Sequence, residues 1–305
     1  MKLAAFPLIC LLPGWALAQT TTRQAVLQTE ADFAAKVAAQ GSRDGFIAFS
    51  APEGVVFEAG DAINAPALWQ SRPAATDASL AWVPAWADAA QSGDMAYTTG
   101  TWTRGPRTAP LTTGQYVTVW HKQSSGDWKF VVNMTIEHGQ VNIPTNPAVT
   151  ASPAAEVFHP LLPTAQALPI IAPNSVLLTL ERKFIVAELK APAKAYQEYL
   201  SAEGRLYRPG QLALTGNVAQ IVSENPGFAY LFVPTTVRVA AAGDLGFVIG
   251  TLRRPSPVIG QAEETGSYLR IWRREAVAGW RLALEMLNAA PSAVAPEGAD
   301  PAAKK

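Results

Sequence analysis

The chain is poor in cysteine and histidine, and this excludes several kinds of site. Cys10 is the only cysteine, and there are three histidines. His121, His138 and His159 have neither the H-x-H nor the H-x-x-x-H spacing of a metal site. Cys10 lies in an N-terminal segment that we expect to be removed, so we expect the mature protein to have no disulfide, no thiol nucleophile and no metal ion. The sequence has no glycine-rich phosphate loop and no G-x-S-x-G motif, so we predict neither a cofactor nor triad hydrolysis.

Charge is also scarce and balanced, with 24 basic and 24 acidic side chains that make up 16% of the chain. This neutrality argues against nucleic acid or an anionic membrane as the partner. The charge is uneven along the chain: residues 19–138 hold 8 basic and 11 acidic side chains, and residues 176–290 hold 13 and 10. These opposite signs favour docking of the two halves on each other, although sequence drift explains them equally well.

The apolar run at the N-terminus is too short for a transmembrane helix. Leu3–Trp15 falls short of the roughly 20 residues that cross a bilayer, and two prolines interrupt it. It follows Lys2 and precedes Ala16–Ala18, which is the order of a secretory signal peptide. We predict that residues 1–18 are removed, that the mature protein is periplasmic or secreted, and that no membrane contact remains.

The sequence does contain a repeat. Gly114–Trp128, which reads GQYVTVWHKQSSGDW, recurs 152 positions later at Gly266–Trp280 as GSYLRIWRREAVAGW. Upstream, four glycines recur at an offset of 150, and Glu30 recurs at an offset of 151 as Glu181. Repetition over this length predicts one domain that occurs twice.

Composition indicates where the two domains begin and end. Residues 139–175 contain seven prolines and a single acidic residue, which is typical of a semi-rigid linker. It separates a first domain, residues 19–138, from a second domain, residues 176–290. Residues 291–305 are rich in alanine and proline, so we expect a disordered tail.

Each half has the same predicted order of elements, with helices first and strands after them. In the first half the pattern predicts helices over 22–40 and 43–49, a helical turn capped by Asn64, and strands over 55–58, 79–91, 95–104, 115–123 and 128–136. In the second half it predicts helices over 175–190 and 192–201, a turn capped by Asn217, and strands over 205–207, 228–240, 245–253, 267–275 and 280–287. Gly93-Asp94 and Gly243-Asp244 are interpreted as hairpin turns. This order predicts an α+β fold with antiparallel sheets.

Four short motifs resemble a known superfamily. They are Trp82-Val83-Pro84, Ser92–Trp102, Tyr116–Lys122 and Gly126–Lys129. Their order is similar to that of the nuclear transport factor two-like superfamily, which includes ketosteroid isomerase and the polyketide cyclases, and most similar to its uncharacterised bacterial branch. The second half lacks the W-x-P element and has Leu231–Pro234 near that place. The resemblance implies two cone-shaped domains, each with a strongly bent antiparallel sheet around a long N-terminal helix. It implies no particular activity, because one such fold carries many functions.

Proton transfer next to a carbonyl, as in the isomerase, needs a carboxylate base in an apolar cavity. No position matches the isomerase's catalytic pair by motif, and the weak candidates for such a carboxylate are Glu285 and Asp44. If the strand face of Glu285 lines the cone, we expect its pKa to be raised. The interpretation we favour is a surface carboxylate near Arg281, or in cross-strand contact with Arg270 or Arg273.

The first half is rich in tryptophan and tyrosine. Strand alternation predicts that Trp82 and Trp86 share one face, with Pro84 between them. Such side chains either fill the core beneath a bent sheet, which we favour, or line a pocket for an apolar or planar ligand. The candidate pocket residues are Trp82, Trp86, Tyr97, Trp102 and Tyr116.

Two classes of function remain open. Abundant aromatic residues and the lack of an assembled acid–base motif favour a non-catalytic module that binds a small apolar ligand or a partner protein. The alternative is a small-molecule isomerase, cyclase or dehydratase that uses a pocket carboxylate. Domains of the resembled superfamily often pair through their sheets, so we also predict an intramolecular pseudo-dimer of the two repeats.

Overall fold

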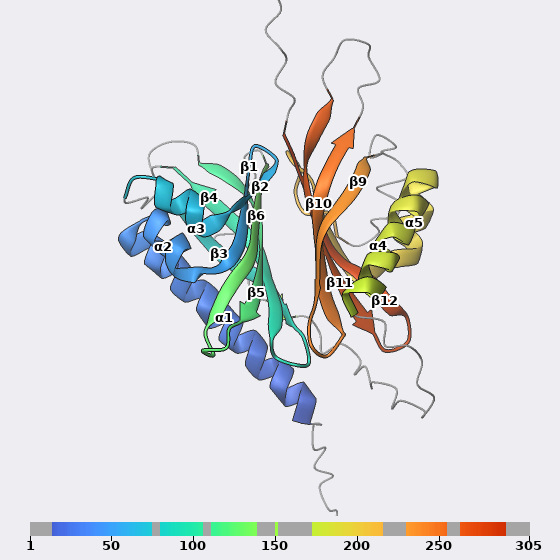
Figure 1. Ribbon diagram of the computed structural model, residues 1–305, viewed down its shortest axis with the longest axis horizontal. Helices are drawn as coiled ribbons and strands as arrows, with labels where there is room; N and C mark the ends of the chain where they lie inside the picture. The colour runs from blue at the N-terminus through green and yellow to red at the C-terminus, as the bar shows by residue number, and fades with distance from the viewer. Residues whose placement is uncertain are drawn as a thin grey trace, which may run out of the picture.

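The computed structural model describes residues 14–74, 80–105, 111–138, 150–151, 173–215, 230–254 and 263–290. Two β-sheets face each other, and helices pack on the outer side of each sheet (Figure 1). The α+β class is therefore confirmed. Among the described residues, no helix is long and apolar enough to cross a membrane. The greater part of the predicted signal peptide and linker, the turn after Asn217 and the predicted tail lie outside the described residues.

The described residues of the first half form one sheet and three helices. Its elements are α1 (Gly14–Gln40), α2 (Ser42–Phe49), β1 (Ser50–Glu58), β2 (Asp61–Asn64), α3 (Ala65–Ser71), β3 (Leu80–Ala89), β4 (Met95–Arg104), β5 (Thr112–Lys122) and β6 (Trp128–His138). Gly41, with φ of 89°, separates α1 from α2, and Asn64 caps α3 by accepting a hydrogen bond from the Ala67 amide at 3.0 Å. Within the predicted linker, β7 (Thr150–Ala151) pairs with β3, so part of that linker belongs to the sheet.

The second half repeats this arrangement with fewer described elements. They are α4 (Pro173–Lys190), α5 (Pro192–Tyr199), β8 (Leu200–Tyr207), β9 (Leu231–Val239), β10 (Leu245–Arg254), β11 (Glu264–Glu275) and β12 (Gly279–Ala290). The strand order β8-β12-β11-β10-β9 is the counterpart of β1-β6-β5-β4-β3 in the first half. Neither sheet is wholly antiparallel, because the first strand of each half pairs in parallel with the last.

Bulges break the strand alternation at equivalent places in the two halves. In β3, Pro84 pairs with Gly100 and Trp86 with Thr99, so Ala85 is the additional residue. The other bulged residues are Val131 in β6, Thr235 in β9 and Ala283 in β12. The predicted common face for Trp82 and Trp86 is therefore wrong: Trp82 packs against the helices and Trp86 against the other sheet.

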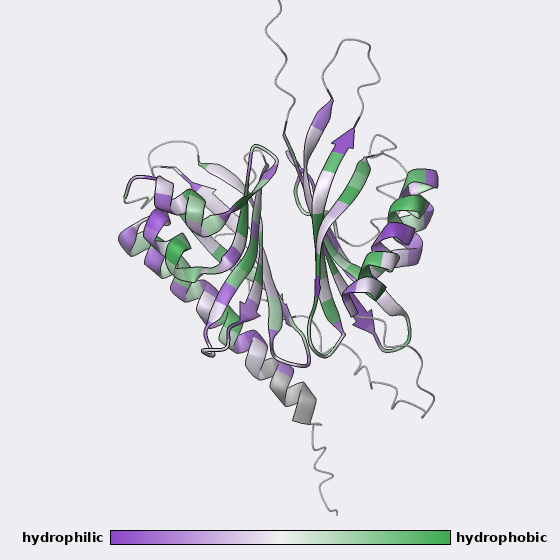
Figure 2. Ribbon diagram, in the orientation of Figure 1, coloured by the Kyte–Doolittle hydropathy of each residue, from purple (hydrophilic) through white to green (hydrophobic). Residues whose placement is uncertain are grey.

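Three clusters of buried apolar side chains hold the molecule together. One lies between each sheet and its helices, and the third joins the two sheets. Apolar residues accordingly run along the strands of both sheets (Figure 2). Trp120 and Trp272 are fully buried at equivalent places, and each indole Nε1 donates a hydrogen bond to a glutamate of its own long helix, Glu30 at 3.1 Å and Glu181 at 2.8 Å.

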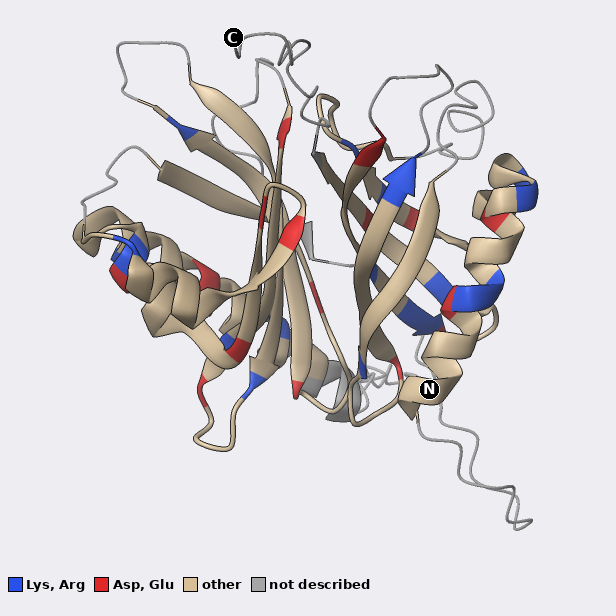
Figure 3. Ribbon diagram, turned by 45° about the horizontal axis from the view of Figure 1, so that its top comes forward, with Lys and Arg blue, Asp and Glu red and all other residues tan. Residues whose placement is uncertain are grey.

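Two ion pairs between the halves follow the difference in their charge. Figure 3 marks Lys and Arg positions in blue on the second half, including its outer helices. Asp88 of the first half pairs with Arg273 of the second at 2.6 Å, and both side chains are buried. Glu53 pairs with Arg238 at 3.3 Å near the surface. In both pairs the first half supplies the acid and the second half the base.

Candidate functional site

A cavity of about 920 Å³ lies between the helices and the sheet of the first half. Its size is within the range of small-molecule sites, roughly 300–1,000 Å³. Every helix of the first half and several of its strands contribute aromatic side chains, which are Phe33, Phe46, Phe57, Trp69, Trp82, Trp102 and Tyr116. Phe46 stacks on Trp69 with ring centroids 4.4 Å apart, and Phe33 meets Trp82 edge-on at 4.9 Å. The wall is thus apolar, aromatic and supported by ring–ring contacts.

A few polar groups interrupt this aromatic wall. Tyr116 is 3% exposed, and its hydroxyl has no hydrogen-bond partner among the described residues. Burial, followed by the charge of Glu30, raises the pKa of Tyr116 well above its ordinary value, so the hydroxyl stays protonated. Asn133, also in the wall, donates a hydrogen bond to Thr118 at 3.0 Å. An unpartnered buried hydroxyl costs free energy, so a hydrogen-bonding partner for the Tyr116 hydroxyl would be stabilising.

The rim of the cavity carries charge and is partly built by the second half. Arg72 lies 4.6 Å over the ring of Trp69 and pairs with Glu58 at 2.5 Å, with both charged side chains substantially exposed. The second half contributes four residues to the lining, which are Pro209, Gly210, Asn288 and Ala289.

The structure brings together three of the five predicted pocket residues. Trp82, Trp102 and Tyr116 line the cavity. Trp86 and Tyr97 lie instead in the cluster between the two sheets, where the Trp86 indole donates a hydrogen bond to the Tyr97 hydroxyl at 3.0 Å. The bulge at Ala85 accounts for Trp86, since it moves every later side chain of β3 to the other face.

Glu30 is a buried carboxylate that the strand and turn patterns of the sequence do not identify as a candidate site residue. It is fully buried and accepts hydrogen bonds from Trp82 at 2.6 Å, Thr98 at 2.5 Å and Trp120 at 3.1 Å. Burial raises its pKa to about 6, although these hydrogen bonds lower it in part. The only signal in the sequence is its recurrence as Glu181 in the second half.

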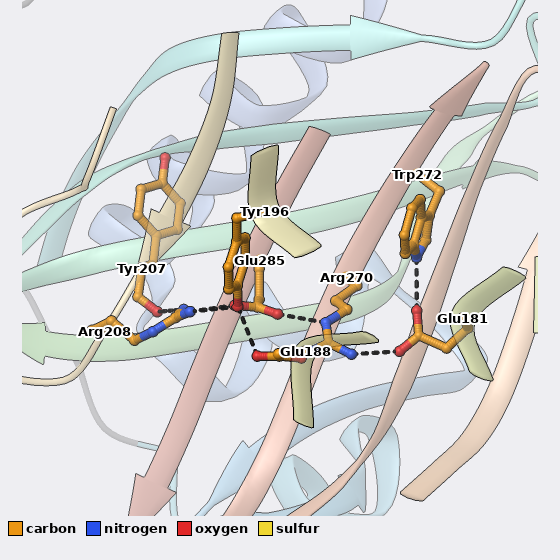
Figure 4. A network of polar contacts seen from close by, with 8 residues as sticks. All are labelled: Glu181, Glu188, Tyr196, Tyr207, Arg208, Arg270, Trp272 and Glu285. Carbon is orange, nitrogen blue, oxygen red and sulfur yellow. Dashed lines mark hydrogen bonds and ion pairs between the residues drawn. The ribbon is translucent and has the colours of Figure 1, made fainter. Parts of the chain in front are cut away.

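In the second half, the corresponding space holds a buried network of charged side chains (Figure 4). Arg270 is fully buried and binds three carboxylates, Glu285 at 2.5 Å, Glu188 at 2.7 Å and Glu181 at 2.8 Å. Its guanidinium also lies within 5 Å of three rings, at 4.1 Å from Phe232, 4.6 Å from Phe184 and 4.9 Å from Tyr268. The side chain of Arg270 therefore fills the centre of this domain.

Glu285 is part of this network, so the favoured surface position is wrong. It is fully buried, pairs with Arg208 and Arg270, and accepts a hydrogen bond from Tyr196 at 2.7 Å. A raised pKa is not found either: burial alone would raise it, but Arg270 and Arg208 lower the pKa of Glu285 to about 2. Of the three predicted arginine neighbours, Arg270 is the one that faces Glu285 across the strands.

Asp44 lies apart from both the cavity of the first half and the buried network of the second half. It is in the first turn of α2, where its carboxylate complements the positive end of the helix dipole. Its side chain is 46% exposed, and its nearest ionic partner is Arg43 at 4.0 Å. Asp44 does not belong to the lining of the cavity.

Several solved structures are similar to parts of this chain. A ketosteroid isomerase-like protein from Erwinia carotovora atroseptica is 19% identical, with a TM-score of 0.34 over 39% of this chain and 96% of that one. An NTF2-like protein from Cytophaga hutchinsonii is 18% identical, with a TM-score of 0.31 over 37% and 95% of the two chains. The hub of a calcium/calmodulin-dependent kinase from S. rosetta is 16% identical, with a TM-score of 0.34 over 39% and 98%. No protein-family model and no curated protein matches the chain.

Proposed function

We propose that the first half of the chain binds a small, planar, predominantly apolar molecule that carries a hydrogen-bonding group, and that it does so without catalysing a reaction. The observation that carries this proposal is the aromatic cavity of about 920 Å³, which is lined by Tyr116 among other aromatic residues. Apolar area supplies the binding free energy and the few polar groups fix the orientation of the ligand.

The position of the acidic side chains favours binding over acid–base catalysis. Among the described residues that line the cavity, the carboxylates are Glu58, which is paired with Arg72 and half exposed, and Glu137, which is exposed. A general base needs a carboxylate within hydrogen-bond reach of the substrate in a water-poor site. Glu285 and Asp44, the predicted candidates, are held in the second-half network and at the surface.

The proposal is tested by calorimetric titration with 2-naphthol, a planar apolar probe with one hydroxyl. Val56, which lines the cavity and is 6% exposed, is replaced in the variant Val56→Phe to fill part of the space. We expect the affinity to fall about tenfold or more, because the probe loses the space that its ring occupies. The matched control is Val277→Phe on an exposed hairpin tip, where Val277 is 92% exposed.

A second variant examines the polar contact. Tyr116→Phe is expected to weaken 2-naphthol binding about fivefold, which corresponds to the ~1 kcal/mol of one hydrogen bond, and to leave naphthalene binding unchanged. Absence of saturable binding by the unaltered protein, or equal binding by the protein with Val56→Phe, would refute a ligand site in this cavity.

A further inference from the structure

The second half of the chain forms part of the wall of a cavity that otherwise belongs to the first half. Pro209 and Gly210 follow β8, and Asn288 and Ala289 lie near the end of β12. All four border the cavity in the first half.

Hydrogen bonds hold the two halves in register around the cavity. They run from the Gly210 amide to the Glu137 carbonyl at 2.8 Å, from Asn288 Nδ2 to the Thr135 carbonyl at 3.3 Å, and from Ser267 Oγ to the Gly60 carbonyl at 2.5 Å. Gly60, Thr135 and Glu137 themselves line the cavity. These three contacts between the halves thus lie at the edge of the site.

The buried network of the second half anchors one of these wall segments. Arg208 directly precedes Pro209, and its side chain, 4% exposed, pairs with Glu285. It also donates a hydrogen bond to Tyr196 at 3.2 Å. Because a paired buried guanidinium is costly to displace, the chain is held firmly just where it reaches the rim of the cavity.

We infer that the second half serves as a fixed wall of the ligand site in the first half, and that Asn288 and the Pro209-Gly210 segment help to determine which ligands fit. This inference rests on the proposed function. It gives the two copies of the fold different roles: the first holds the ligand, while the second, whose centre is filled by its own arginines, closes the site from one side.

Protection of single cysteines by a bound probe tests this arrangement. Because Cys10 is the only cysteine of the chain, Cys10→Ser provides a background without thiols. Asn288→Cys reports on the second-half wall, and Leu111→Cys, at a cavity residue that is 37% exposed, reports on the first-half wall. Val277→Cys is the distant control. The measurement is the rate of modification by N-ethylmaleimide with and without saturating 2-naphthol.

We expect the probe to slow modification at positions 288 and 111 about fivefold and to leave position 277 unchanged, because a ligand in such a site is largely enclosed by its wall. Pro209→Cys provides a second readout that leaves the Asn288 hydrogen bond intact. Protection at position 111 without protection at 288 or 209 would overturn the inference and leave the ligand site standing. Lack of protection at all of these positions would overturn both.

Discussion

A few side chains distinguish the open centre of the first half from the filled centre of the second. The helix glutamate and the buried tryptophan are common to both, as Glu30 with Trp120 and Glu181 with Trp272. Where the first half has Thr118 and Asn133, paired across β5 and β6, the second has Arg270 and Glu285, paired across β11 and β12. The longer, charged side chains Arg270 and Glu285 fill the centre of the second half, whereas Asn133 in the first half borders the cavity.

The charges of the second-half network balance if one carboxyl group is protonated. Three glutamates, Glu181, Glu188 and Glu285, face the two arginines Arg208 and Arg270. Burial raises the pKa of Glu188 to about 7, even though Arg270 opposes this shift. A neutral Glu188 leaves two negative and two positive groups, which avoids an uncompensated buried charge.

The buried network of the second half should make the protein less stable as pH rises. The ordinary pKa of Glu188 is 4.5, and in the folded protein it is about 7. Between these values the unfolded chain releases the proton while the folded chain retains it, so stability falls as pH rises from about 4.5 to about 7. Glu30, with its pKa raised to about 6, acts in the same direction.

Glu188→Gln is expected to remove the contribution of Glu188 to the pH dependence of stability. The amide is neutral at every pH, so the variant should be more stable than the unaltered protein by about 1–3 kcal/mol at pH 8 and similar to it at pH 5. Urea unfolding at the two pH values measures the difference. Glu203→Gln, at an exposed position in β8, is the control and should show no such gain. A gain that is equal at both pH values would contradict the protonated state of Glu188.

At the scale of elements, the sequence predicts the helices and most of the strands. It does not predict which face of the sheet each strand side chain lies on. The predicted strand over 95–104 coincides with β4, and the predicted helices agree with α1, α2, α4 and α5 apart from their ends. Alternation then fails at the bulge in β3, because one additional residue reverses every later side chain. Pro84 is the available hint, since proline within a strand is typical of an edge or a bulge.

The repeated Gly-Asp turns close their hairpins, as predicted, and they also connect the two halves. Gly93 and Gly243 have φ of 67° and 69°, as the turns require. Each aspartate also reaches the other half: Asp94 accepts a hydrogen bond from the Ala241 amide, and Asp244 accepts one from the Gln91 amide, both at 3.0 Å. This reciprocal exchange is the pattern of a two-fold symmetric interface.

Asp244→Ala is expected to destabilise the protein by about 1–3 kcal/mol, because Asp244 is 1% exposed and its loss removes the hydrogen bond that its carboxylate accepts from the Gln91 amide. Asp127→Ala is the matched control, since Asp127 lies in an exposed hairpin turn and its carboxylate accepts a hydrogen bond from the nearby Ser125 hydroxyl. Chemical denaturation of both variants gives the comparison. Equal losses would mean that the contact between the halves adds nothing beyond the turn itself.

At the scale of the whole molecule, the face-to-face sheets support our proposal of an intramolecular pseudo-dimer. The cluster between the sheets contains apolar residues from both halves, including Tyr97 and Val117 from the first half and Phe247 and Leu269 from the second. Arg205 of the second half also lies 4.1 Å over the ring of Trp86 in the first. Separation of the halves would expose these apolar faces to water.

Separate expression of residues 19–138 tests this proposal. We expect this half to aggregate or to self-associate through its exposed sheet face, and to recover a defined complex when residues 176–290 are produced with it. Light scattering measures the state of association. A first half that is soluble, monomeric and stable alone would count against the pseudo-dimer.

The repeat in the sequence predicts that the fold occurs twice, but not that the two copies differ in their centres. That difference depends on which side chains meet across the sheet, as Arg270 meets Glu285, and on the bulges that set their direction. Isolated residues such as Asp44 and Glu285 are therefore poor predictors of a site. The aromatic residues Trp82, Trp102 and Tyr116 are better predictors of a site, because large aromatic side chains form the cavity wall. This holds whatever the positions of the polar groups.

The most direct measurement is a crystal structure of the full chain grown with 2-naphthol. Our account predicts electron density for the probe in the first half, between Trp82 and Tyr116, and an intact network around Arg270 in the second half. Density for the probe in the second half among Glu181, Glu188 and Arg270, or a first-half cavity closed by its own side chains, would contradict it.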